Sequence, residues 1–433
     1  MADWFRLDNA ALIFPAVRRR DWTNAFRVSA TLNETVRPEI LQRAVDMLLP
    51  RFPSVYVCLR KGMFWYYLQR LSRPPKVRPE GACPLIHMTG RELRQCCFRV
   101  LYYENRIAVE YFHAVTDGSG GMCFLKTLAA AYLTLAHEIK ITPGFGVLDI
   151  CQKPTAEELE DRFNQTAGSI ALSRREENAL RLRGAREEDG FLHLIIASVP
   201  QEQLLDLAHQ HRCTVTALLS AVMLQSVLAL AHLPQRGRWA KVTVAVDLRR
   251  VLGGSTLRNF ALAVNVGVDP RLGAYTLEDL IRAVQSQLDT HCLLYTSPSQ
   301  LDPQVPRQQM AARVAANVQP SQNYFIRIMP RPVKDAVMRM VYNRVGECKG
   351  SLNISNLGKS ELPEEMRPYV RYLDFTIGPQ ATYPNNCSVV SYGGVTRIDL
   401  IRSTRRPRLE RDFLNRLVEL GLEVTVDSNE RTT

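Results

Sequence analysis

The chain has 433 residues, of which 46% are hydrophobic and 23% charged, and its formal net charge is +12. This composition excludes a disordered chain, and the length predicts two cores or two lobes of one large fold. The positive charge favours an anionic partner such as a nucleotide-bearing cofactor, an acidic carrier protein, nucleic acid or an anionic lipid surface. Charge alone does not choose among these partners.

Residues 1–152 are predicted to form an N-terminal lobe. Alternating apolar residues predict a strand at 28–32, and a helix is expected to open at Pro38 and stop at Pro50. Two hairpins follow, over residues 55–60 with 63–69 and over 97–103 with 106–112. The last of these strands leads into His113. The glycines at 118, 120 and 121 are then expected to break the regular structure before an apolar helix from about 122 to 137.

A charged segment, residues 153–190, is predicted to cross over to a C-terminal lobe at 191–433. Strands are expected at 193–199, 241–249, 259–268, 351–356, 370–377, 396–402 and 423–427. Helices are expected at 201–211, 216–230, 277–291, 332–345 and 408–420, and a loop at 297–323. Because strands and helices alternate in both lobes and no repeat is present, the fold class predicted is α/β.

The longest apolar helix candidate, residues 216–230, is shorter than the ~20 residues that a bilayer requires and contains Ser220, Gln225 and Ser226. We expect a buried core helix here and no transmembrane segment. The N-terminal segment places acidic and aromatic residues before its basic run, the reverse of the order in a secretory signal. The ten cysteines include no CxxC pair. Together these features predict a cytoplasmic protein.

The segment His113-Ala-Val-Thr-Asp117-Gly118 lies on the predicted strand-to-helix loop. Spacing alone would place His113 and Asp117 on one helix face, but the glycines that follow favour a loop. Such a loop can present an imidazole at the mouth of a channel, where its near-neutral pKa suits removal of a proton from an acceptor attacking a carbonyl. We therefore predict that His113 is a general base. The alternative is a partly buried structural histidine.

This segment resembles the HxxxDG signature of the chloramphenicol acetyltransferase superfamily, which includes plant BAHD acyltransferases, alcohol acetyltransferases and peptide-synthetase condensation domains. The resemblance is greatest to bacterial alcohol acetyltransferase-like proteins and extends along nearly the whole chain. It covers, in order, LDNAALIFPA (7–16), RFPS (51–54), VDLRR (246–250), NF (259–260), SNLG (355–358) and GLEVTVDSN (421–429). It implies a two-lobed α/β fold with mixed sheets, flanking helices and a tunnel between the lobes.

The resemblance also implies a reaction. An acyl group, acetyl or short-chain, would pass directly from acyl-CoA as co-substrate to an alcohol or amine acceptor, with no permanently bound cofactor and no metal. Asp117 would turn away from the substrate and pair with an arginine that braces the loop, for which Arg249 is our candidate. Gly118 would belong to the substrate-binding loop.

Two alternatives stay open. The first is a condensation-type transferase that uses the thioester of an acidic acyl carrier protein, although Phe112 stands where condensation domains usually carry a first histidine. The second is a catalytically inactive binding scaffold of the same fold. The sequence does not distinguish O-acyl from N-acyl transfer and leaves open the acyl chain length and the acceptor.

The SLNISNLG segment offers a candidate for a second catalytic group. Transfer from a thioester passes through an oxyanion, which requires a hydrogen-bond donor held in place beforehand. By the resemblance, Ser355 is predicted as that donor and Asn356 as a substrate contact. The alternative is a Ser-Asn-Gly turn with polar caps. The following LDFTIGP (373–379) resembles the BAHD motif DFGWG, and its Asp374 is predicted to be structural.

Other constellations give weaker signals. The spacing of His209, His211 and Cys213 fits no zinc pattern, so no metal site is predicted. The arginine cluster at 402–411 lacks the interleaved aromatic residues that stack on bases, so we expect a solvated loop and no nucleic-acid partner. No GxSxG, phosphate loop or GxGxxG is present, which excludes the hydrolase and nucleotide-binding motifs.

Overall fold

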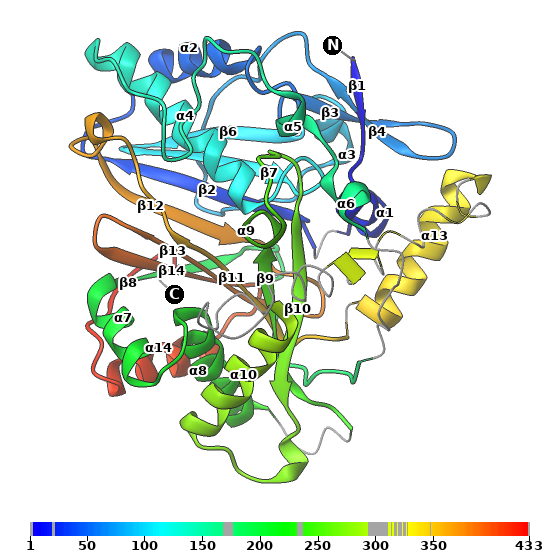
Figure 1. Cartoon of the computed structure of the whole chain (residues 1–433), viewed down its shortest axis with the longest axis vertical. Coiled ribbons are helices and arrows are strands. Elements are labelled where there is room, and N and C mark those ends of the chain that lie inside the picture. Colours follow the sequence, from blue (N-terminus) through cyan, green and yellow to red (C-terminus); the bar gives the residue numbers. More distant parts are fainter. Residues whose placement is uncertain are drawn as a thin grey trace.

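The computed structural model describes residues 3–19, 22–167, 176–231, 237–292, 311–312, 314–315, 318, 323, 326, 328–346 and 348–431. These residues form two lobes, the first in the upper half of Figure 1 and the second in the lower half. A five-stranded sheet in the order β12-β2-β7-β6-β5 supports the first lobe, and a seven-stranded sheet in the order β10-β9-β11-β13-β14-β8-β15 supports the second. A small sheet, β1-β4-β3, flanks the first lobe.

The first lobe is built mainly from the N-terminal part of the chain. Its strands are β1 (Trp4–Arg6), β2 (Ala25–Leu32), β3 (Val57–Lys61), β4 (Tyr66–Arg70), β5 (Arg78–Pro79), β6 (Phe98–Tyr103) and β7 (Arg106–Phe112). Its helices are α1 (Ile13–Val17), α2 (Pro38–Leu48), α3 (Gly90–Leu93) and α4 (Gly118–His137), with a 3₁₀ turn at Ala10–Leu12. β7 pairs antiparallel with β2 on one side and with β6 on the other. The β6–β7 pair is the predicted hairpin.

The crossover contains two short helices, α5 (Ala156–Leu159) and α6 (Arg162–Thr166). The strands that follow are β8 (His193–Pro200), β9 (Ala240–Asp247), β10 (Ala261–Val268), β11 (Leu352–Lys359), β12 (Val370–Ile377), β13 (Asn385–Tyr392), β14 (Val395–Arg402) and β15 (Thr425–Ser428). The helices are α7 (Gln201–Gln210), α8 (Val215–Leu230), α9 (Leu248–Leu252), α10 (Leu277–Cys292), α13 (Arg331–Val341) and α14 (Arg408–Glu419). Shorter turns lie at Pro270–Leu272, Tyr342–Gly346 and Glu364–Met366.

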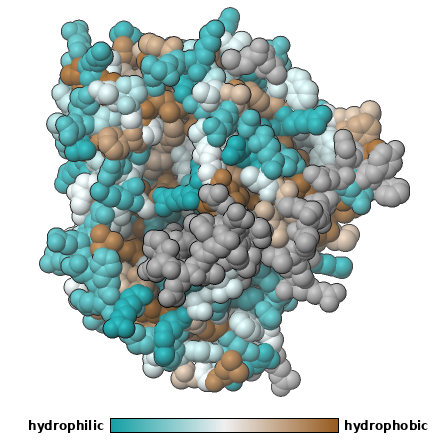
Figure 2. All heavy atoms as spheres, viewed as in Figure 1, coloured by the Kyte–Doolittle hydropathy of each residue, from teal (hydrophilic) through white to brown (hydrophobic). Residues whose placement is uncertain are grey.

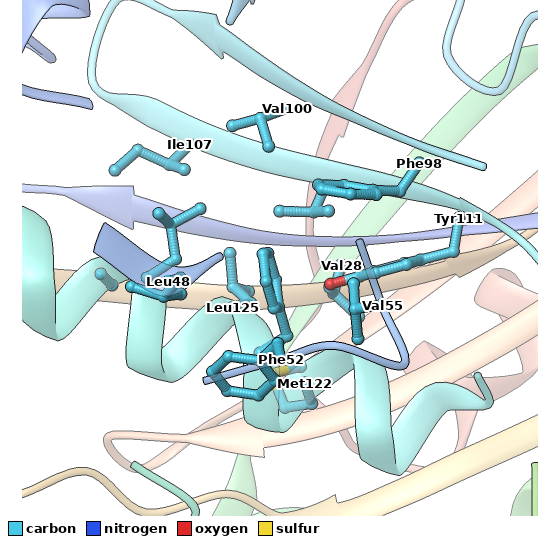
Figure 3. Packing of buried hydrophobic residues seen from close by; sticks show 14 of the residues in the cluster. Val28, Leu48, Phe52, Val55, Phe98, Val100, Ile107, Tyr111, Met122 and Leu125 are labelled. Carbon is cyan, nitrogen blue, oxygen red and sulfur yellow. The ribbon is translucent and has the colours of Figure 1, made fainter. Parts of the chain in front are cut away.

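The core of the first lobe lies between its sheet and helices α2 and α4. α2 begins with Pro38 and buries Leu41, Val45 and Leu48, at the spacing of one helix face. Figure 3 shows Leu48 beside Leu125 of α4, under the strand residues Val100 and Ile107. The interdigitation of strand and helix side chains excludes water from this layer, and hydrophobic burial of this kind is the main stabilising contribution to such a core.

The core of the second lobe is centred on α8. Its side chains are buried on several faces, from Ala217 through Leu224, and the Thr214 hydroxyl caps it by accepting from the Ala217 amide at 3.2 Å. The predicted buried helix is therefore confirmed. Among the described residues, no single helix is long and apolar enough to cross a membrane, although α7 and α8 together, bent by 81°, meet the criteria of length and composition.

Most predicted elements are present, and four departures from the prediction concern α4, β13, the loop at 297–323 and β12. The apolar helix α4 begins at Gly118 rather than near residue 122, because Asp117 caps its first turn. β13 was not predicted, since Asn and Ser residues interrupt its apolar pattern; all its residues are buried where polar partners satisfy them. Of the predicted loop at 297–323, the described residues at 311–318 are helical, and most of the rest lies outside the described residues.

β12 is the fourth departure. Residues 370–377 were assigned to the second lobe, yet β12 pairs antiparallel with β2 at the edge of the first sheet. β12 also bonds to the second lobe: the backbone amide of Ile377 donates to Ser388 Oγ of β13 at 2.9 Å. In Figure 1, β12 lies between β2 and the β13–β14 pair. This strand therefore joins the two lobes.

Candidate functional site

Asp117 is the N-cap of α4 and has both carboxylate oxygens engaged. Oδ1 accepts from the Gly120 amide at 3.1 Å. Oδ2 accepts from Arg249 Nη1 at 2.9 Å and from the Phe260 amide at 2.7 Å. The predicted contact with Arg249 is thus confirmed. Because these donors occupy the carboxylate, Asp117 holds the loop to the second lobe and is not free to exchange protons with a substrate.

Arg249 also binds several groups in the surrounding segment of the second lobe. Its guanidinium also donates to Asp247 Oδ1 at 3.0 Å, to the Thr256 carbonyl at 2.8 Å and to the Arg258 carbonyl. Burial disfavours the charge of Arg249, but the Asp117 and Asp247 carboxylates outweigh burial and raise its pKa. Arg249 therefore stays charged and fixes the path of residues 256–258 against residues 113–118, which we call the histidine loop.

The two lobes approach closely around this loop. Thr116 Oγ1 donates to the Leu257 carbonyl at 2.6 Å, and Ser119 Oγ donates to Asp247 Oδ2 at 2.6 Å. A Cβ at Gly120 would lie only 2.2 Å from Thr116 Oγ1 and 2.4 Å from the Leu257 carbonyl oxygen. Glycine at this position thus allows the first turn of α4 to pack directly on the second lobe.

His113 follows β7 and lies half-buried among aromatic side chains. Its ring stacks on Phe14 at a centroid distance of 4.8 Å and meets the Phe26 ring edge to face at 5.1 Å. Its backbone amide donates to the Asn24 carbonyl at 2.8 Å. Burial lowers the pKa of the imidazole below its ordinary value, because the charged ring loses hydration there. The neutral form, which can accept a proton, is therefore favoured.

A relay of side chains orients the His113 ring. Nδ1 lies 3.0 Å from Oδ1 of Asn259, and Asn259 Nδ2 donates to Asp8 Oδ2 at 3.1 Å. Asp8 is fully buried; its Oδ1 accepts from the Ala11 amide at 2.8 Å, and Arg258 lies 3.8 Å away. Since an amide oxygen only accepts, Nδ1 carries the ring proton, and the lone pair is left on Nε2.

The carboxyl group at the end of this relay has an unusual environment. Burial raises the pKa of Asp8 to about 7, although the Arg258 guanidinium opposes the rise. When ionised, Asp8 can only accept hydrogen bonds, so it orients the Asn259 amide with its NH₂ toward Asp8 and its oxygen toward His113.

Gly118 is where β11 and β12 approach the histidine loop. A Cβ at Gly118 would lie 2.9 Å from Leu357 Cδ2 and 3.0 Å from Phe375 Cζ. Along β11, the buried Ile354 faces the core of the second lobe, so the half-buried Ser355 lies on the opposite face. Ser355 is therefore on the side of the sheet that faces the first lobe, and its predicted oxyanion role stays a prediction.

Asn356 is engaged in local structure. Its Nδ2 donates to Thr216 Oγ1 at 3.1 Å, and its Oδ1 accepts from the Gly358 amide at 2.7 Å. Gly358 has a φ of +74°, which glycine adopts without strain. The segment is not the Ser-Asn-Gly turn of the structural alternative, because it lies within β11, whose register with β13 shifts between Asn356 and Lys359. The predicted substrate contact of Asn356 stays a prediction.

Asp374 lies on β12 and is buried between the lobes. Its Oδ1 accepts from Arg397 Nε of β14 at 2.7 Å, and its Oδ2 accepts from Ser29 Oγ of β2 at 3.4 Å. The carboxylate therefore links strands of both sheets. Its position agrees with the structural role predicted for it.

Three residues around the imidazole, Asp8, Phe14 and Asn259, were not predicted as site residues from the sequence. Two of them lie in LDNAALIFPA and the third in the NF pair, segments that were noted for their resemblance alone. The signal available was an acidic residue beside an otherwise apolar stretch at 10–17. A buried acidic residue requires a hydrogen-bonding partner. The local sequence does not identify this partner, because Asn259 belongs to the other lobe.

The two other groups considered in the sequence, His209 with His211 and Cys213 and the arginine cluster at 402–411, each contain a residue paired with a carboxylate. Among the described residues, no group of three or more His, Cys, Asp and Glu side chains could hold a metal ion. Nδ1 of His211 lies 2.8 Å from Glu278. The arginine cluster was expected to be a solvated loop, but Arg402 is fully buried in β14 beside Glu430, because this pairing offsets the loss of hydration.

Comparison with protein-family models gives no match, and neither does comparison with curated protein sequences. Solved structures do match. F. graminearum TRI101 complexed with coenzyme A and deoxynivalenol is 10% identical, with a TM-score of 0.57 over 98% of this chain and 100% of that chain. Polyketide synthase associated protein 5 from Mycobacterium tuberculosis is 14% identical, with a TM-score of 0.55 over 95% of this chain and 96% of that chain.

A third match is the epimerization domain from the third module of tyrocidine synthetase B, at 11% identity and a TM-score of 0.58 over 96% of each chain. At these identities the likeness shows the fold. The chain therefore has the two-lobed mixed α/β fold of chloramphenicol acetyltransferase-like and condensation-domain proteins, as the sequence predicted. The tunnel between the lobes stays a prediction.

Proposed function

We propose that this protein is an acyltransferase that moves an acyl group from a thioester to an alcohol or amine, with His113 as the general base. One observation carries the proposal: His113 Nδ1 is bonded to an acceptor, the Asn259 amide oxygen, 3.0 Å away. The Nε2 lone pair is then available for a proton from the substrate. The fold shared with acetyltransferases and condensation domains supports the same class of reaction.

The proposed reaction has two steps around one tetrahedral intermediate. Nε2 of His113 accepts the proton of the acceptor O–H or N–H while the acceptor atom forms a bond to the thioester carbonyl carbon. The carbon–sulfur bond then breaks, and the departing thiolate takes the proton back from Nε2. Ser355 is our candidate donor to the oxyanion, because it lies on the face of β11 that is directed toward the first lobe.

We propose acyl-CoA as the donor. The exposed Arg250 donates from Nη2 to the Leu357 carbonyl at 2.7 Å, and its guanidinium lies beside Gly358. Leu357 in turn approaches Gly118, so this cation is close to the histidine loop and can attract a phosphate of coenzyme A. A carrier-protein thioester is the alternative donor, and the net charge of +12 would suit an acidic carrier.

The test is to incubate the purified protein with acyl-CoA donors of several lengths, or with a carrier-bound acyl group, and with mixed alcohol and amine acceptors. Acylated product should be followed by mass spectrometry, because the exposed Cys151 would contribute background in a thiol assay. We expect His113→Ala to lower turnover by about 10²- to 10⁴-fold. His209→Ala, an exposed histidine on α7, is the matched control.

Three outcomes are informative. Turnover that depends on His113 supports the proposal, and the donor that supports it distinguishes coenzyme A from a carrier. Binding of coenzyme A without turnover would indicate the scaffold alternative. Equal turnover in His113→Ala and wild type, or no product with any donor, would overturn the proposal.

A further inference from the structure

Helix α13 (Arg331–Val341) lies at the periphery of the molecule, at the right edge of Figure 1. Its outward face is apolar: Val333 is 52% exposed, Val337 42%, Met340 57% and Val341 53%. These positions are spaced i, i+4, i+7 and i+8, so they form one stripe along the helix. Figure 2 shows hydrophobic residues gathered at the same edge.

The polar side chains of α13 are directed inward instead. Lys334 is buried, and its Nζ donates to the Phe64 carbonyl at 3.0 Å. Arg339 donates from both Nε and Nη2 to the Ala16 carbonyl at the end of α1. α13 is thus amphipathic with its polar residues bonded to the first lobe and its apolar residues in solvent. This is the reverse of a helix that covers a core.

Charge around the apolar stripe is positive. Asp335 is the one acidic residue in the sequence from 328 to 346, and it accepts from the Tyr66 hydroxyl at 2.8 Å. Arg344 is exposed, as is Lys61, which directly precedes the Gly62 and Met63 carbonyls that bond to Arg331 of α13. The apolar stripe is therefore bordered by exposed cations, on a chain whose net charge is +12.

A second copy of the chain is a poor occupant for this stripe. Eleven helical residues span roughly 16 Å, so pairing two such stripes would bury far less than the roughly 800 Å² per partner of a standard interface. Two copies of charge +12 would also repel each other. The stripe offers no hydrogen-bonding side chain to direct a protein partner, whereas a lipid surface requires only apolar insertion and cations beside it.

We propose that α13 is a docking surface for an anionic membrane. The stripe of Val333, Val337, Met340 and Val341 inserts at the boundary of headgroups and acyl chains, and the bordering cations contact anionic headgroups. The proposed membrane docking does not depend on the proposed acyltransferase activity, because it is argued from the exposed stripe of α13 and the cations beside it.

The test is co-sedimentation of the full chain with vesicles of phosphatidylcholine alone and of phosphatidylcholine with phosphatidylglycerol. We expect binding to the anionic vesicles that weakens as salt is raised. The double variant Val337→Glu, Met340→Glu should lose binding by about tenfold or more, because it places charge in the inserting stripe. Val418→Glu, at a position 55% exposed on α14, is the matched control and should bind as wild type does.

Circular dichroism of the double variant should match that of wild type, because both substituted side chains are in solvent. Absence of binding to anionic vesicles overturns the proposal. So does binding that the double variant retains, since this would indicate general attraction of a basic protein to anions. A concentration-dependent dimer that the double variant abolishes would assign the stripe to a second copy instead.

Discussion

Replacing Asn259 by alanine tests how much the orientation of the His113 ring contributes to the rate, because Asn259 itself takes no part in the proposed proton transfer. The bond from His113 Nδ1 to Asn259 Oδ1 is 3.0 Å long, and it strengthens when the ring becomes charged in the transition state. A neutral hydrogen bond contributes about 0.5–1.5 kcal/mol, and one to a charged group contributes about 1.5–3 kcal/mol. The difference of about 1–1.5 kcal/mol corresponds to roughly 5- to 15-fold in rate. Loss of the preferred tautomer roughly halves the active population, which brings the expected decrease in kcat to about 10- to 30-fold.

The assay is steady-state kinetics with the best donor and acceptor pair across a pH series. KM should change little, because Asn259 does not need to touch substrate. The pKa of His113 should fall further below its ordinary value, because the bond to Asn259 favours the charged ring. Asn265→Ala is the matched control, because it removes an amide from β10, the strand that follows Asn259, and the partners of this amide are Thr243 and Glu176.

Asp8→Ala provides a second test of the same relay. Without the carboxylate, the Asn259 amide can rotate and present its NH₂ to Nδ1, which forces the ring proton onto Nε2 and removes the base. We expect a decrease in kcat comparable to that of Asn259→Ala and little additional loss in the double variant, because both act through one bond. A folded Asn259→Ala variant with unchanged kcat and an unchanged pH profile would refute the relay.

Four further outcomes are expected. Arg249→Ala should lower the free energy of unfolding by about 3–5 kcal/mol in urea denaturation, because it leaves Asp117 buried without its counter-charge; an effect below 1 kcal/mol would contradict a bracing role. Gly120→Ala should destabilise by about 1–3 kcal/mol and lower turnover, because its Cβ would clash with backbone. Phe124→Ala, fully buried in the first core, should cost about 3–5 kcal/mol with kinetics of the remaining folded protein unchanged. Burial raises the pKa of Asp8 to about 7, so the folded state holds this proton more tightly than the unfolded chain does. Its contribution to the unfolding free energy should fall by up to about 4 kcal/mol as pH rises from 4 to 8, and Asp8→Asn should remove this slope in urea titrations.

The sequence predicted what depends on local pattern. The buried helix α8 followed from an apolar run too short for a bilayer, and β6 and β7 followed from two apolar strands joined by Glu104 and Asn105. Local pattern also placed His113 at the end of a strand. The fold came from the ordered set of segments that resemble one superfamily, and the structural neighbours agree with it.

Contacts between distant residues could not be predicted in the same way. Asp117 could be paired with Arg249 only by resemblance, and Asn259 could not be assigned to His113, because nothing in either local pattern encodes a 3.0 Å contact across the lobes. β13 was missed for a related reason. Its Asn385 and Ser388 are polar residues that a strand pattern excludes, yet they bond to Glu410 and to the backbone of Ile377 in the folded protein.

The placement of β12 has a consequence for how the chain acquires its structure. The first sheet cannot be completed until residues 370–377 are available, because their strand forms the edge beside β2. During synthesis, the edge of β2 therefore stays unpaired until residues 370–377 have been made. Pairing over such a sequence separation slows folding and exposes a strand edge to aggregation. A fragment ending at residue 152 should therefore be less soluble than the full chain, and the two lobes should unfold in one cooperative transition.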